Sequence, residues 1–190
     1  MTSMDCFVDL DIRSDPEFPA HVLLSELYKK LHRTLVISQR TDIAISFPQY
    51  ASRPPSLGTR FRLLAAQPDL EALMNTNWLG GMRDFASHGA LGRVPEHAVA
   101  RTLRRVQAKS NPARLRRRLM RRHDVTVEQA QVRIPDSAAE FVSLPFVQLS
   151  SGSTGQPFRL FLKLGPPQSS HTTGKFNAFG LSLDATIPWF

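Results

Sequence analysis

The sequence predicts an α+β protein in which helices and strands alternate along the chain. Two observations carry this expectation. In some segments apolar and polar residues alternate, which indicates half-buried strands, and in others apolar residues recur every three or four positions, which indicates amphipathic helices. The chain has 190 residues, of which 42% are hydrophobic and 21% charged. This composition is typical of a globular protein with a sizeable core rather than a disordered one.

The first half of the chain is expected to run strand, helix, strand, strand, helix, strand. Alternation predicts strands near residues 6–12 and 43–47, and leucines at helical spacing predict a helix over 20–38. Further along we expect a loop over 49–58, a strand over 60–64, a helix over 69–75 and a last strand near 91–94. This order is the ferredoxin-like βαββαβ pattern. We therefore predict a ferredoxin-like domain over residues 1–97 and a smaller α/β domain over residues 98–190.

The second half is expected to hold two helices and then three strands. Asn111 is a favoured N-cap and Pro112 a favoured first helical residue, which predicts a helix over 112–123. Thr126 and Gln129 fit a capping box for a further short helix before Pro135. We also expect extended chain at 105–109, strands at 146–149 and 158–164 around a loop over 150–156, and a final strand that includes 176–183.

The basic residues are concentrated in one short segment. The chain carries 24 Lys and Arg against 16 Asp and Glu, a net charge of +8, and ten of the basic residues lie between Arg101 and Arg122, where there is no acid. At about 100° per residue, five arginines of the expected helix share one arc: Arg114, Arg117, Arg118, Arg121 and Arg122. A one-signed run of this kind predicts a helix that binds a polyanion, and a solvated helix face is the alternative. Charge does not decide between RNA and DNA.

Several classes of protein are disfavoured by the sequence. No apolar run is long enough for a membrane span, and the N-terminus lacks the pattern of a signal peptide. The single cysteine, Cys6, excludes a disulfide framework and a cysteine-built zinc site. We therefore expect a reduced, cytoplasmic protein. Asp9 and Asp11 project to one side of a strand, a geometry suited to Mg²⁺ or to a solvated strand face.

Two stretches of the basic segment, residues 105–112 and 114–124, closely resemble the CRISPR repeat-processing endoribonuclease of type I-F systems. Other stretches that look like this family are 11–13, 15–19, 30–32, 144–147, 153–156, 158–161, 180–182 and 188–190. The resemblance covers nearly the whole chain. It is most specific in the basic segment and weaker between residues 48 and 100.

The resemblance implies a role for individual residues. Arg105 and Gln107 match residues that read base pairs at the foot of the repeat hairpin, and Phe158 matches an aromatic residue that stacks on the terminal base pair. His32 and Ser151 match the catalytic pair. Arg118 matches an arginine near the foot of the stem. Four more residues match family residues that contact the RNA backbone, namely Arg117, Arg121, Arg122 and His123. We add Arg114, which shares the arginine arc, and Ser153 and Thr154, which lie in the loop over 150–156.

The resemblance further implies a metal-independent cut with no cofactor, after which the protein stays on its RNA as a subunit of the interference complex. RNA supplies its own nucleophile, the 2′-OH, so that a histidine can act as the base and a serine can fix the ribose. In place of the family's tyrosine before Gly180 this chain has Phe179, which leaves His32 with one possible orienting partner fewer. Two alternatives stay open: a catalytically silent RNA-binding subunit, and a metal nuclease that uses Asp9 and Asp11.

Overall fold

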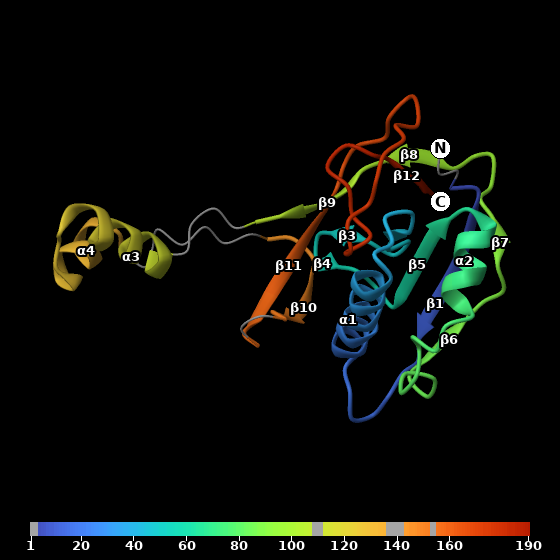
Figure 1. Cartoon of the computed structure of the whole chain (residues 1–190), viewed down its shortest axis with the longest axis horizontal. Coiled ribbons are helices and arrows are strands. Elements are labelled where there is room, and N and C mark those ends of the chain that lie inside the picture. Colours follow the sequence, from blue (N-terminus) through green and yellow to red (C-terminus); the bar gives the residue numbers. More distant parts are fainter. Residues whose placement is uncertain (1–3, 108–111, 136–142, 153–154) are drawn as a thin grey trace. The chain divides into compact units, whose positions relative to one another are not determined.

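The computed structural model describes residues 4–107, 112–135, 143–152 and 155–190. By packing, the chain divides into two compact units, residues 1–105 together with 144–190, and residues 106–143. These packing units differ from the two domains predicted from the sequence, residues 1–97 and 98–190, and that division of the chain remains a prediction. Figure 1 gives the course of the chain within each unit.

The first unit is built on a five-stranded sheet whose strands pair antiparallel. Its strands are β1 (Cys6–Ile12), β2 (Ala44–Ser46), β5 (Arg60–Ala65), β6 (Ala86–His88) and β7 (Gly92–Arg93). The order is β2-β5-β1-β6, and β7 also pairs with β1. Every second residue of β1 is buried, from Cys6 to Ile12, so the alternation in the sequence marks the core face of the central strand, as predicted.

Helices α1 (Ala20–Ser38) and α2 (Gln67–Met74) lie across the same side of this sheet (Figure 1). The bounds of α1 agree with those predicted from its leucines, and Leu24, Leu27, Leu31 and Leu35 are all buried. The helix ends where Gln39 takes the left-handed conformation, with φ of 50°. The apolar face of α1 therefore packs against the core, and the residues on the other faces of the helix are available for a functional role.

The remaining strands of this unit form three smaller sheets. A three-stranded sheet has the order β10 (Phe146–Ser150), β11 (Pro157–Leu164) and β9 (Leu103–Val106). Two-stranded sheets join β12 (Ile187–Trp189) to β8 (Val99–Arg101), and β3 (Ala51–Ser52) to β4 (Pro55–Ser56). The backbone N–H of Gln148 on β10 donates to the Ser25 hydroxyl on α1 over 3.1 Å, which ties the edge of the three-stranded sheet to the helix.

Three expectations from the sequence are corrected by the structure. The prediction of a final strand that includes 176–183 is wrong: residues 177–181 form a tight turn, and β12 begins only at Ile187. The strand expected near 91–94 is present as β7, but a further strand that was not expected, β6, precedes it and also pairs with β1. The loop expected over 49–58 contains the short hairpin of β3 and β4. Strands of two or three residues carry too little alternation to be seen in a sequence.

The second unit contains the helices α3 (Pro112–His123) and α4 (Val127–Arg133). The predicted bounds of α3 are confirmed, whereas its predicted N-cap, Asn111, lies outside the described residues. The predicted capping box of α4 is present, with hydrogen bonds in both directions between Thr126 and Gln129. Arg116 donates from Nε to the carbonyl oxygen of Ile134 over 2.7 Å, which links the two helices.

Candidate active site

His32 lies half-buried on α1, one helical turn after the buried Tyr28. Its Nδ1 is 2.8 Å from the carbonyl oxygen of Ala178. A carbonyl oxygen only accepts hydrogen bonds, so Nδ1 is the protonated nitrogen of the neutral ring. The lone pair is then on Nε2, which is the nitrogen able to take a proton from a substrate.

The ring of Phe179 covers one face of the His32 imidazole. Their centroids are 3.9 Å apart and their planes are within 5° of parallel. The Tyr28 hydroxyl donates to the carbonyl oxygen of Phe179 over 2.7 Å. Burial raises the pKa of Tyr28 well above its ordinary value, which keeps the hydroxyl protonated and able to donate. Tyr28 and His32, which lie one turn apart on α1, therefore form hydrogen bonds with the carbonyl groups of two successive residues, Phe179 and Ala178.

Those carbonyl groups belong to the turn over residues 177–181, and the side chain of Asn177 organises it. The Asn177 side-chain oxygen accepts hydrogen bonds from the backbone N–H of Phe179 at 2.9 Å and from that of Leu181 at 3.3 Å. Gly180 has φ of +67°, and a Cβ added there would lie 2.7 Å from Cγ2 of Ile45. This position therefore requires glycine for both its conformation and its close approach to β2.

Arg105, which is predicted to contact RNA, lies beside this turn and next to Phe158, another residue predicted to contact RNA. The Arg105 guanidinium carbon is 5.7 Å from the ring centroid of Phe158 and 6.0 Å from that of Phe179. A cation over aromatic rings is held electrostatically at such distances. The structure thus brings two of the predicted site residues, His32 and Arg105, to Phe179, and Arg105 also contacts the third, Phe158.

Ser151 follows β10 at the start of the hairpin loop. Its backbone N–H donates to the carbonyl oxygen of Gln156 over 2.9 Å, and its own carbonyl accepts from Gly155 over 2.8 Å. Gly155 has φ of +66°, so the loop closes through a residue that tolerates the left-handed conformation. Ser151 belongs to the same unit as His32, but it is not among the contacts around Phe179 described above. Ser153 and Thr154 lie outside the described residues.

The arginines of α3 meet the expectation of a shared arc. A hollow of about 570 Å³ is lined by Arg114, Arg117, Arg118, Arg121 and Arg122. All five are exposed, as is His123, whereas Leu115 and Leu119 are half-buried. Gln107 is exposed and directly follows β9. The geometry of α3 is that of a helix presenting one cationic surface, and the RNA-contacting roles of these residues stay predictions.

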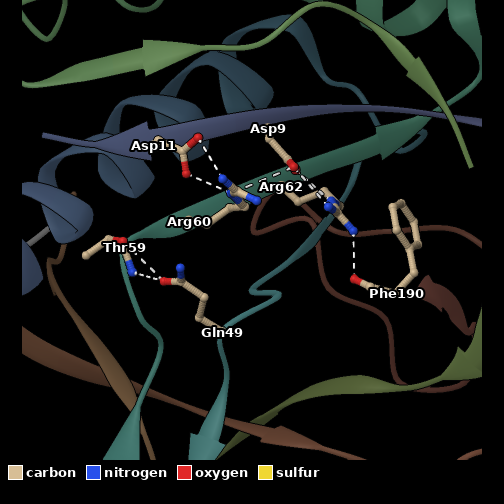
Figure 2. A network of polar contacts seen from close by, with 7 residues as sticks. All are labelled: Asp9, Asp11, Gln49, Thr59, Arg60, Arg62 and Phe190. Carbon is tan, nitrogen blue, oxygen red and sulfur yellow. Dashed lines mark hydrogen bonds and ion pairs between the residues drawn. The ribbon is translucent and has the colours of Figure 1, made fainter.

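The two aspartates considered as magnesium ligands are instead paired with arginines across β1 and β5 (Figure 2). Asp9 accepts from Nε and Nη2 of Arg62 at 2.6 and 2.9 Å, and Asp11 accepts from Nε of Arg60 at 2.7 Å. Arg62 is buried, and its Nη1 also donates to the carbonyl oxygen of Phe190 over 2.9 Å. Each carboxylate therefore has a cationic partner on the neighbouring strand, which favours a structural role for this pair over a metal site.

Within residues 4–107, 112–135, 143–152 and 155–190, no group of three or more His, Cys, Asp or Glu side chains is arranged to hold a metal ion. No helix in the described part of the chain is long and apolar enough to cross a membrane.

Asn177 and the carbonyl of Ala178 were not anticipated from the sequence. The Ala178 carbonyl is a backbone group 146 residues from His32 along the chain, so no local pattern points to it. Asn177 and Gly180 are typical turn residues, and their spacing was a usable signal against the strand expected there.

These features, a histidine with a fixed lone pair and a separate cationic helix on a mixed α/β scaffold, are compatible with an enzyme that acts on a polyanion. The comparisons with known proteins then give the family. A family model described as "CRISPR-associated protein (Cas_Csy4)" matches residues 7–190, and the chain belongs to this family. The resemblance to type I-F repeat-processing endoribonucleases is thereby confirmed.

Two relatives are similar over nearly the whole chain. The CRISPR-associated endonuclease Cas6/Csy4 of Pseudomonas aeruginosa (strain UCBPP-PA14) is 48% identical over 187 residues, which cover 98% of this chain and all of the relative. The protein of the same name from Escherichia coli (strain UTI89 / UPEC) is 38% identical over the same shares of the two chains.

Proposed function

We propose that this protein is a metal-independent endoribonuclease that cuts CRISPR precursor RNA at the base of the repeat hairpin and stays bound to the product. The observation that carries the proposal is the hydrogen bond from His32 Nδ1 to the Ala178 carbonyl, because it leaves Nε2 as a general base. The two relatives named endonucleases and the cationic surface of α3 support the same activity.

In this mechanism the nucleophile comes from the RNA. His32 Nε2 takes the proton of the 2′-OH, and the 2′-oxygen attacks the adjacent phosphorus. The bond to the 5′-oxygen breaks and this oxygen takes up a proton from solvent, which gives a 2′,3′-cyclic phosphate and a 5′-OH. Ser151 is assigned to the ribose, which it holds in line for attack.

Binding is divided among the remaining residues. Arg105 and Gln107 read base pairs at the foot of the stem, Phe158 stacks on the terminal pair, and α3 holds the phosphates of the stem through its arginines. Guanidinium groups suit both tasks, since their forked donors match phosphate oxygens and guanine edges. We further propose that the five-stranded sheet with α1 and α2 is a ferredoxin-like domain, and that the protein acts in the cytoplasm with other subunits of the type I-F interference complex.

The test is cleavage of the cognate repeat RNA with and without EDTA. We expect equal cutting in both, with a 2′,3′-cyclic phosphate at the new end. Binding without cutting would favour the catalytically silent subunit, and cutting that EDTA abolishes would contradict metal independence.

A further inference from the structure

The turn that holds His32 depends on one exposed side chain, that of Asn177. Its oxygen accepts from two backbone N–H groups, those of Phe179 and Leu181, while its backbone carbonyl accepts from Gly180 over 2.8 Å. Its own N–H donates to Leu181 over 2.9 Å. Asn177 therefore makes four of the hydrogen bonds that close the turn, and asparagine is favoured at such a position because its side chain mimics a backbone acceptor.

The turn is also anchored to the core on both sides. The N–H of Phe176 donates to the carbonyl of Thr41 over 3.0 Å, just after the end of α1. On the other side, the N–H of Ile45 on β2 donates to the carbonyl of Gly180 over 3.1 Å. The ends of the turn are fixed by these bonds, and the Phe179 carbonyl is held by the Tyr28 hydroxyl. The direction of the remaining Ala178 carbonyl is set by the conformation that Asn177 maintains.

We propose that Asn177 is a positioning residue that fixes the tautomer and orientation of His32, an inference that rests on the proposed function for its catalytic consequence. The Asn177 side chain aims the Ala178 carbonyl at Nδ1 and brings the Phe179 ring against the imidazole. Without it, the Ala178 carbonyl loses its fixed direction. The free imidazole then distributes its proton between both nitrogens, and molecules protonated on Nε2 have no base facing the substrate.

The first measurement uses the free protein and needs no RNA. The ring nitrogens of His32 are observed by ¹⁵N NMR at a pH where the imidazole is neutral, with the signals assigned by their loss in His32→Ala. We expect the wild-type ring to be protonated on Nδ1 alone, and Asn177→Ala to show a mixture of tautomers together with weaker shielding by Phe179. A single Nδ1-protonated form in Asn177→Ala would overturn the positioning role.

Two further variants separate positioning from general damage. Asn177→Asp keeps the acceptor oxygen and is expected to retain the wild-type tautomer. Ser182→Ala is the matched control, because the Ser182 hydroxyl accepts from the backbone N–H of Ala185 at 3.1 Å and so caps the adjoining turn rather than the one that faces His32. If Ser182→Ala changed the His32 tautomer as much as Asn177→Ala does, the assignment to Asn177 would be overturned.

Single-turnover cleavage of the repeat RNA then measures the catalytic consequence. We expect Asn177→Ala to cut about ten- to hundredfold more slowly at saturating protein, with RNA affinity unchanged, since displacement of a catalytic group by about 1 Å costs that much. A wild-type rate in Asn177→Ala would overturn the positioning role, whereas absence of cutting by the wild-type protein would contradict the proposed function and leave the NMR result standing.

Discussion

The imidazole of His32 lies flat on the ring of Phe179, with centroids 3.9 Å apart and planes within 5° of parallel. The contact uses the ring face of Phe179, and the Nδ1–H of His32 donates its hydrogen bond to a backbone carbonyl, that of Ala178. A tyrosine hydroxyl at position 179 is therefore not needed for either of these two contacts.

The first prediction concerns this ring. Phe179→Tyr should change the single-turnover cleavage rate by less than about tenfold, or about 1.4 kcal/mol of barrier, because it keeps the stacked face. Phe179→Ala should cost more, since it frees one side of the imidazole. Both rates are measured at saturating protein, so that binding does not contribute. An increase of several hundredfold in the cleavage rate of Phe179→Tyr would show instead that the wild-type chain is an impaired nuclease. It would favour the alternative of a catalytically silent RNA-binding subunit.

The second prediction concerns the aspartates of β1. Asp9→Asn should destabilise the fold by about 3 kcal/mol, because it leaves the buried Arg62 without its charged partner. Asp11→Asn should cost less than about 1 kcal/mol, because the Asp11 and Arg60 side chains are 43% and 41% exposed. Urea unfolding gives both values. Neither variant should change the cleavage rate of folded protein, and a large loss of activity in Asp11→Asn without loss of stability would revive the metal hypothesis.

Local signals explain which parts of the structure were predictable from the sequence. The bounds of α1 and α3 agree with the prediction because leucine spacing, or a proline at the first helical position, defines a helix within a few residues. The surroundings of His32 depend on a segment about 146 residues away, and Phe176 with its apolar neighbours looked like a strand. Only the fold brings that turn to α1, so the resemblance indicates His32 and position 179, whereas it does not indicate Asn177 or the Ala178 carbonyl.

The third prediction divides the basic residues by role. Arg121→Gln should weaken binding to all hairpins alike and lower the slope of log affinity against log salt by about 1, as expected for one phosphate contact. Gln107→Ala or Arg105→Ala should cost about 1–3 kcal/mol, mainly for hairpins with the correct foot of the stem. Arg116→Gln is the control on the same helix, because the Nε of Arg116 is directed to the Ile134 carbonyl. Equal losses on cognate and scrambled stems for Arg121 and Gln107 variants would refute this division.

The last prediction separates binding from chemistry at His32. His32→Ala should bind the hairpin nearly as well as the wild-type protein, because a general base acts in the transition state, and should cut at least about 10²-fold more slowly. The matched substrate change is an RNA with a 2′-deoxy sugar just upstream of the scissile phosphate, which removes the proposed nucleophile and leaves the stem unchanged. Wild-type protein should bind this RNA with unchanged affinity and fail to cut it. If the deoxy RNA is cut at the normal rate, water or a protein group is the nucleophile, and the hydrogen bond from His32 Nδ1 to Ala178 would have to serve a different step. If instead His32→Ala loses affinity in proportion to its loss of rate, the histidine contributes to binding rather than to proton transfer.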